Sequence, residues 1–169
     1  MRGFAIVLIA ALLSACGFQL RGSYTLPWET LYISLPEFDI LRADIKRNIE
    51  AATQTRIVAD RKEAQAALVI TRNDALRSIL SLDAKAKPRE IQLTRVFVYS
   101  LQDGSGKALG PAGQIVLQRD MTYDDNLILA KQGEEAMIQR EMQDDLVQQL
   151  MRRLAAFKPE ADRPATPAK

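Results

Sequence analysis

The only cysteine of the chain, Cys16, stands where a lipid could be attached. It follows Leu-Ser-Ala at 13–15, which completes a lipobox. Arg2 precedes an apolar stretch at 4–12, and small residues stand before the point of cleavage, as in a secretion signal. If the signal is cut before Cys16, the thiol takes a diacylglyceryl group and the new amine takes a further acyl chain. We therefore expect residues 1–15 to be a lipoprotein signal peptide and Cys16 to be the lipidation site.

This expectation places the mature protein on a membrane surface and not across the membrane. The apolar stretch is too short for a transmembrane helix, which needs about 20 residues. One acyl chain binds a bilayer only marginally, whereas two or more anchor a protein stably. An ordinary signal peptide with a cysteine nearby by chance is the alternative.

Residue types that most hydrolase active sites and zinc sites use are missing. The chain has no histidine and no cysteine besides Cys16, so zinc sites and His-dependent nucleophilic catalysis lose their usual groups. A hydrolase based on serine or carboxylates stays open, although the chain lacks a Gly-x-Ser-x-Gly motif. The 23 basic and 21 acidic residues nearly balance, which gives no reason to expect nucleic acid as a partner. We expect a protein that is not an enzyme and that uses no cofactor.

Two groups of basic residues have the chemistry to hold phosphates. Lys85, Lys87 and Arg89 lie close together in a predicted turn, where they could grip an anion. Lys131 lies at a predicted junction of loop and helix, where backbone amides and the helix dipole add positive potential. The alternative for both groups is that the side chains are simply solvated.

Three aspartates suggest a cation site, but their spacing argues against it. Asp120, Asp124 and Asp125 lack the loop pattern of a calcium site. Solvated acids in a turn are the better interpretation, so we expect no metal site.

Short apolar segments with turn residues between them predict a sheet. Aromatic and β-branched residues at 29–35, an apolar run at 66–72, alternation at 91–101 and a return segment at 114–123 indicate strands. The segment at 56–60 is a shorter apolar run, and 75–83 is a weaker prediction of a continuing or bent strand. A slip in the alternation at Thr94 and Arg95 predicts a bulge.

Two segments have the period of an amphipathic helix. Residues 38–52 place Leu41, Ile45 and Ile49 on one stripe, and Asp39 stands at the N-cap position. From about residue 127 a longer helix carries its stripe to Phe157. Its apolar positions are Ile138, Met142, Leu146, Val147, Leu150, Met151 and Leu154.

The order of these elements predicts an α+β two-layer sandwich. We expect a mixed, mostly antiparallel sheet of about four strands with two helices packed on one face. The predicted domains are the signal peptide at 1–15, a lipidated tether at 16–28, the sandwich at 29–157 and a disordered tail at 158–169.

The beginning of the predicted mature chain carries a family resemblance. Ala-Cys-Gly-Phe-Gln-Leu-Arg-Gly at 15–22 resembles the opening of the LPS-assembly lipoproteins, the LptE family of Gram-negative outer membranes. A second match is Leu-Ala-Lys at 129–131 with Glu135 and Glu141, which is similar to the start of that family's last helix. Chain length, element order and the tail rich in proline and alanine agree as well.

The resemblance implies a function and several site residues. It implies a plug-and-barrel complex with the LptD β-barrel, which assists barrel assembly and inserts lipopolysaccharide into the outer leaflet. Lys131 matches a family lysine implicated in lipopolysaccharide binding, and Lys85, Lys87 and Arg89 lie near a second basic determinant. Gly17 after Cys16 is compatible with sorting to the outer membrane, on its periplasmic side. Trp28, beside a proline and with few core neighbours expected, is the candidate contact to the barrel.

A rival hypothesis is a free-standing outer-membrane lipoprotein that binds a lipid or glycan without a barrel. It would require an apolar pocket within the sandwich. The plug hypothesis instead requires a polar surface that suits the polar lumen of a barrel.

Overall fold

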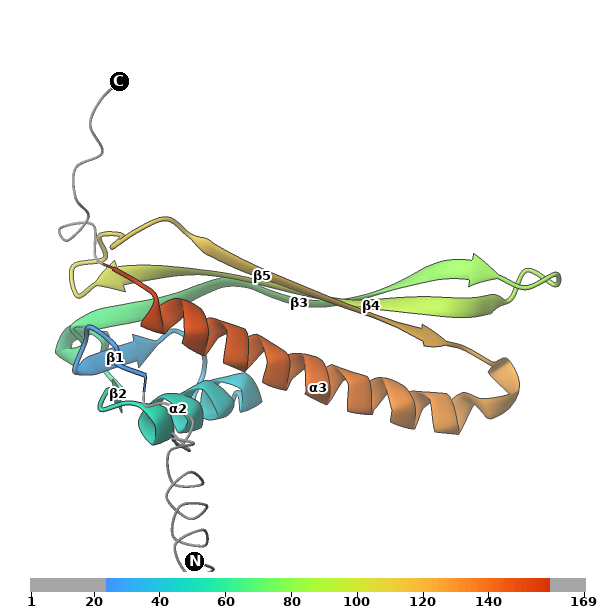
Figure 1. Cartoon of the computed structure of the whole chain (residues 1–169), viewed down its shortest axis with the longest axis horizontal. Coiled ribbons are helices and arrows are strands. Elements are labelled where there is room, and N and C mark those ends of the chain that lie inside the picture. Colours follow the sequence, from blue (N-terminus) through green and yellow to red (C-terminus); the bar gives the residue numbers. More distant parts are fainter. Residues whose placement is uncertain (1–23, 159–169) are drawn as a thin grey trace, which may run out of the picture.

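The computed structural model describes residues 24–158 (Figure 1). The predicted signal peptide, Cys16, residues 17–23 of the predicted tether and the chain beyond residue 158 lie outside the described residues. Helices (α), short 3-10 helices (η) and strands follow one another in the order β1 (Thr30–Ile33), α2 (Ile40–Ala52), β2 (Arg56–Val58), η1 (Arg61–Glu63), β3 (Ala66–Leu82), β4 (Pro88–Asp103), β5 (Gly113–Thr122), η2 (Asp125–Leu127) and α3 (Ile128–Ala155).

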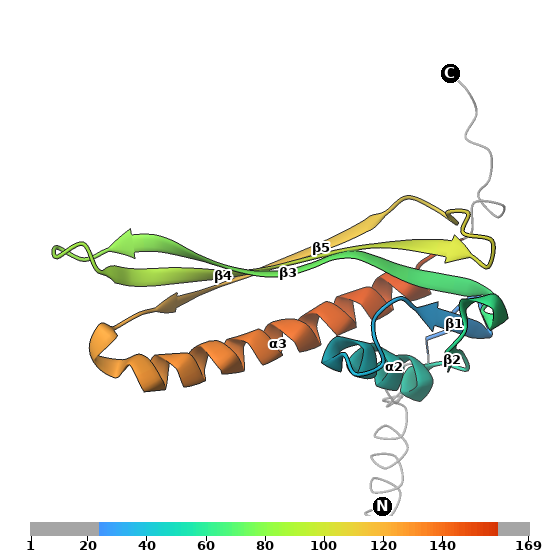
Figure 2. The same cartoon turned by 180° about the vertical axis from the view of Figure 1, so that it is seen from behind.

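The strands form one mixed sheet, and both long helices lie on one of its faces (Figures 1 and 2). The order across the sheet is β2-β1-β3-β4-β5, with β1 parallel to β2 and β3 and the other pairs antiparallel. The predicted α+β class is confirmed. The sheet has five strands because residues 56–58, which the sequence marks only as a short apolar run, pair with β1.

The β3–β4 hairpin is much longer than the other strands (Figure 1). β3 has 17 residues, and at about 3.3 Å per residue it reaches about 55 Å. Only its first residues, Ala66–Leu68, pair with β1. The two strand segments expected at 66–72 and 75–83 are therefore one continuous strand, and its turn lies far from β1.

The bulge expected at Thr94 and Arg95 is absent. Both residues pair in continuous register with β3 and with β5, and the register shifts lie elsewhere, the first between Ile70 and Arg72. The sequence pattern misleads because Arg95 occupies an inward position between the buried Leu93 and Phe97. Its Nε donates to Oδ1 of Asn73 at 3.0 Å, so a polar residue interrupts the apolar alternation without a bulge.

Helix α2 forms as the sequence predicts. Oδ1 of Asp39 accepts hydrogen bonds from the N–H of Leu41 at 2.8 Å and of Arg42 at 3.3 Å, which caps the helix. Leu41, Ile45 and Ile49 are buried and form the predicted stripe.

An arginine ties α2 to the end of β1. Arg42 is 8% exposed. Its Nη1 donates to the carbonyl of Ile33 at 2.7 Å and to that of Leu35 at 3.1 Å. These bonds satisfy the carbonyl of the last residue of β1 and one carbonyl two residues beyond it.

Helix α3 covers the sheet with its second half and continues past the core with its first half. Met142, Leu146, Leu150 and Leu154 are buried, as predicted, whereas no residue before Met142 is buried. Among residues 24–158, no helix has both the length and the apolar character that a membrane crossing requires.

The predicted tether reaches into the core. Leu26 and Trp28 are each 8% exposed, and the ring of Trp28 packs on that of Phe157 with centroids 5.3 Å apart. The expectation that Trp28 has few core neighbours is wrong, because the residues after α3 bring Phe157 against it. The sandwich therefore begins before residue 29.

Candidate functional site

The turn of the β3–β4 hairpin and the segment between β5 and α3 lie at the same end of the molecule (Figures 1 and 2). The N–H of Tyr123 donates to the carbonyl of Arg89 at 2.8 Å, which continues the pairing of β4 with β5 toward this end. The start of β1 and the last turn of α3 lie at the opposite end. We call the turn at 83–87, η2 and the first turn of α3 the distal end.

The distal turn is fixed by one carboxylate. Oδ1 of Asp83 accepts from the backbone N–H of Lys85 at 2.8 Å and of Lys87 at 2.9 Å. The bonds from the Lys87 and Lys85 amides hold the pKa of Asp83 below its usual value. Ala86 has a left-handed backbone with φ 60°. The turn therefore presents its lysines from a fixed backbone, although Lys85 has no ion pair among the described residues.

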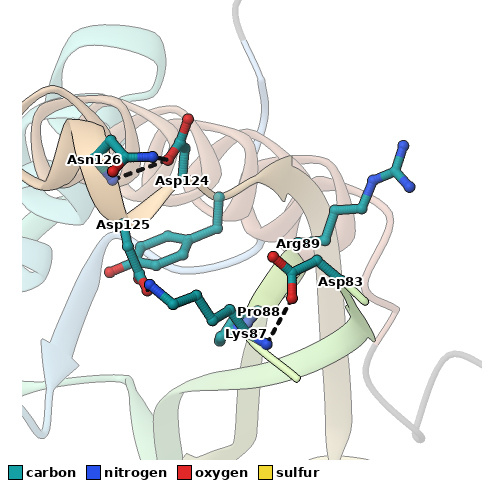
Figure 3. A pocket seen from close by; sticks show the side chains of 8 residues that line it. Asp83, Lys87, Pro88, Arg89, Asp124, Asp125 and Asn126 are labelled. Carbon is teal, nitrogen blue, oxygen red and sulfur yellow. Dashed lines mark hydrogen bonds and ion pairs between the residues drawn. The ribbon is translucent and has the colours of Figure 1, made fainter. Parts of the chain in front are cut away.

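A polar pocket of about 310 Å³ lies beside this turn (Figure 3). It is open between the hairpin and η2, and charged or polar groups form most of its wall. Its lining residues are Asp83, Lys87, Pro88, Arg89, Tyr123, Asp124, Asp125 and Asn126.

Lys87 joins the hairpin to η2 across the pocket. Its Nζ lies 3.0 Å from Oδ2 of Asp125. This hydrogen-bonded partner raises the pKa of Lys87, so its ammonium is charged at neutral pH. Figure 3 shows the side chain of Arg89 extending away from the pair formed by Lys87 and Asp125.

Lys131 is held in place at the start of α3. Its Nζ lies 3.1 Å from Oγ1 of Thr122 and 2.8 Å from Oε2 of Glu134, and its side chain is only 15% exposed. A freely solvated lysine would be far more exposed, so the simplest alternative to a binding role does not describe this residue.

The two predicted basic groups lie toward the same end of the molecule. Thr122, which contacts Lys131, pairs across the sheet with Glu90, the neighbour of Arg89. Lys87 in turn contacts Asp125, close before α3. The structure thus brings together Lys131 and the basic turn, whose proximity the sequence could not establish.

Sequence reasoning missed one further cation at this end. The guanidinium of Arg77 lies 5.2 Å from the centroid of the Tyr123 ring, and its Nε lies 3.6 Å from Oε2 of Glu135. The hairpin register places Arg77 opposite the buried Leu93, on the helix side of the sheet. A correct prediction of the hairpin register would have placed Arg77 on this face.

Large apolar side chains are exposed near these charges. They come from the last part of β3, from η2 and from the start of α3, where no other element covers them. They are Ile79, Leu80, Leu82, Leu127, Ile128 and Leu129. Cationic groups and exposed apolar side chains thus both occur toward this end of the molecule.

The three aspartates that suggested a cation site have separate structural partners. Asp120 accepts from Nε2 of Gln92 at 3.0 Å, Asp124 caps η2 through the N–H of Asn126 at 2.8 Å, and Asp125 pairs with Lys87. Within residues 24–158, no group of three or more acidic, histidine or cysteine side chains is arranged to hold a metal ion.

The sequence matches the model of a known family, LptE, described as lipopolysaccharide-assembly, over residues 28–154. The match covers most of the chain, including the hairpin and α3. Among curated proteins, none matches the chain at a significant level.

Several solved structures share the fold. Lipoprotein B from Nitrosomonas europaea is 32% identical with a TM-score of 0.72, and the alignment covers 83% of this chain and 92% of that one. A minor lipoprotein from Acinetobacter baumannii is 23% identical with a TM-score of 0.63, covering 78% of this chain and 93% of that one. Rare lipoprotein B from Shewanella oneidensis is 20% identical with a TM-score of 0.64, covering 75% and 94%.

The last two structures are too distant in sequence to show more than the fold, but the family model and the Nitrosomonas protein agree over most of the chain. This protein belongs to the LptE family of lipopolysaccharide-assembly lipoproteins.

Proposed function

We propose that this protein is a periplasm-facing lipoprotein of the outer membrane that forms a plug-and-barrel complex with the LptD β-barrel. In this role it assists barrel assembly and the insertion of lipopolysaccharide into the outer leaflet. Family membership supports a part in lipopolysaccharide assembly, and the family is one of non-enzymatic lipoproteins. The proposal includes cleavage after residue 15 and a lipid on Cys16.

We further propose that the distal end binds lipopolysaccharide directly. The observation that carries this step is that Lys131 and the turn bearing Lys85, Lys87 and Arg89 lie together, although they are far apart in sequence. Ammonium groups at one end of the molecule suit the phosphates of lipid A, because charge-assisted hydrogen bonds to phosphate are short and strong.

The start of α3 supports the same assignment. Its N-cap residue, Leu127, makes no side-chain cap hydrogen bond. The dipole of a helix favours a negative group near its first turn. The exposed leucines nearby suit the acyl chains of the same ligand, since an amphiphile needs both kinds of contact.

The rest of the surface suits a plug. The apolar stripes of α2 and of the second half of α3 face the protein's own core. Charged residues of both signs occupy many exposed positions of the strands and helices, which fits a polar barrel lumen. Trp28, buried against Phe157, is no part of the proposed contact with the barrel.

The rival, a free-standing lipoprotein that holds a lipid or glycan inside the sandwich, has less support. It requires an apolar cavity, whereas the pocket beside the distal turn is lined mainly by charged and polar residues.

The proposal is tested by purifying tagged protein from detergent-solubilised envelopes and identifying what comes with it by mass spectrometry. We expect a large β-barrel in stoichiometric amount with the wild type. Cys16→Ala serves as the anchor variant, and we expect it to leave the membrane fraction. Wild-type protein that is recovered alone would replace the plug hypothesis with the rival.

A further inference from the structure

Both lysines that converge at the distal end already have a carboxylate partner within the chain. Nζ of Lys87 lies 3.0 Å from Oδ2 of Asp125. Nζ of Lys131 lies 2.8 Å from Oε2 of Glu134. Each carboxylate oxygen therefore occupies one of the three N–H donors of its ammonium and competes for that donor with a ligand phosphate oxygen.

These two carboxylates can be displaced. The side chains of Asp125 and Glu134 are 36% and 45% exposed, and ion pairs at that exposure are weak and easily exchanged. When a ligand displaces either carboxylate from its lysine, water can hydrate that carboxylate. The exchange therefore leaves no buried, unpaired carboxylate.

The neighbouring carboxylates are engaged differently. Asp83 accepts two backbone amides of its own turn, and Asp124 caps η2. Losing either would break the local backbone structure. Asp125 and Glu134 are thus the exchangeable counter-ions of Lys87 and Lys131.

We propose that Asp125 and Glu134 set the ligand specificity of the distal end: they exclude lipids whose phosphates carry one charge and admit lipids that carry phosphomonoesters. This inference rests on the proposed binding of lipopolysaccharide at this site. Beyond that binding, it specifies the class of anionic lipid that the distal end accepts and the residues that exclude other anionic lipids.

The reason is a balance of charge. A phosphodiester carries a single negative charge, so when it replaces a carboxylate beside Lys87 or Lys131 the charge next to the ammonium does not change. A phosphomonoester carries about −1.5 to −2 at pH 7 and also offers three acceptor oxygens. Exchange is therefore favourable only for the phosphomonoester, and a lipid with two such groups gains at both lysines.

The test compares binding to two kinds of phosphatidylcholine vesicle. One contains bisphosphorylated lipid A, and the other contains phosphatidylglycerol of equal total charge. The double variant Asp125→Asn with Glu134→Gln removes the two counter-ions. Asp120→Asn with Glu141→Gln is the matched control, because it changes net charge equally but touches neither lysine.

We expect the wild type and the control to prefer lipid A vesicles. In the Asp125/Glu134 variant, binding to phosphatidylglycerol should rise by about three- to tenfold, which lowers the preference for lipid A. The inference is overturned if both variants gain equally on both vesicles, since that result means general electrostatics only.

The remaining outcomes distinguish a failure of the specificity inference from a failure of the proposed binding of lipopolysaccharide. If the wild type binds lipid A but the Asp125/Glu134 variant keeps the same preference, the specificity inference fails and the proposed binding stands. If no form binds lipid A, the proposed binding fails as well. Release of the wild type from lipid A by inorganic phosphate at equal concentration would overturn the assignment to a lipid headgroup.

Discussion

The ammonium of Lys131 lies 3.1 Å from the hydroxyl of Thr122, so the first turn of α3 is fastened to the end of β5. Thr122 pairs with Glu90 on β4, the strand that begins at the basic turn. This contact adds to the core packing that holds α3 against the sheet. As a result, Lys131 and the basic turn lie toward the same end of the molecule, although they are far apart in sequence.

Trp28 should contribute to folding rather than to a partner contact. Trp28→Ala removes a buried ring from the contact with Phe157, and we expect it to lower the free energy of unfolding by about 3 kcal/mol. Urea denaturation measures this loss. Phe38→Ala is the control, because that ring is 89% exposed and its loss should change stability by less than about 0.5 kcal/mol. Equal effects would contradict the assignment of Trp28 to the core.

Arg42 should contribute more to the free energy of unfolding than an exposed charged residue does. Arg42→Ala leaves two carbonyls at the end of β1 without their donor, and we expect a loss of about 2 kcal/mol. Arg47→Ala removes the ion pair of a largely exposed guanidinium with Asp44 on the same helix, whose carboxylate still accepts from Nε2 of Gln143, and should cost less than about 1 kcal/mol. Thermal unfolding followed by circular dichroism compares the two. A loss for Arg42→Ala no greater than for Arg47→Ala would refute the role of the buried guanidinium.

The distal turn offers a stabilising substitution. Ala86 has φ 60°, a conformation that costs a residue with a Cβ about 1 kcal/mol and glycine almost nothing. Ala86→Gly should therefore leave stability unchanged or raise it by up to about 1 kcal/mol. Ala84→Gly, in the same turn but without a positive φ, should lower it. Denaturant midpoints measure both, and destabilisation of equal size would contradict the turn geometry.

Acidification should loosen the distal turn. The amides of Lys87 and Lys85 lower the pKa of Asp83 in the folded protein, so its contribution to stability is present above the unfolded value of about 4 and is lost as pH falls through the lower folded value. An NMR pH titration of the Lys87 amide should show a midpoint below that of a free aspartate. Asp83→Asn should abolish this titration. A midpoint at or above the free value would show that the carboxylate does not accept these bonds.

Local patterns predicted the helices well because they depend on residues close in sequence. The spacing of Leu41, Ile45 and Ile49 and the cap at Asp39 were sufficient for α2, and both are confirmed. Burial at Trp28 was missed because it depends on Phe157, at the far end of the chain.

The hairpin shows the same limit. Arg95 interrupts the apolar alternation, and only its bond to Asn73 on the facing strand explains why the register continues. The candidate lysines were recognisable by type and by family resemblance, but their partners were not. Asp125 reaches Lys87 through the docking of η2 on the hairpin, which no periodicity encodes.

The central claim is that the converging lysines of the distal end bind lipopolysaccharide. The most direct measurement is the affinity of purified protein for lipopolysaccharide in the wild type, in Lys87→Ala with Lys131→Ala, and in Lys46→Ala with Lys62→Ala. The last pair removes the same charge from exposed positions on α2 and η1. We predict that the distal pair loses about tenfold in affinity while the control pair stays near the wild type. Equal affinities for the two double variants would contradict the account.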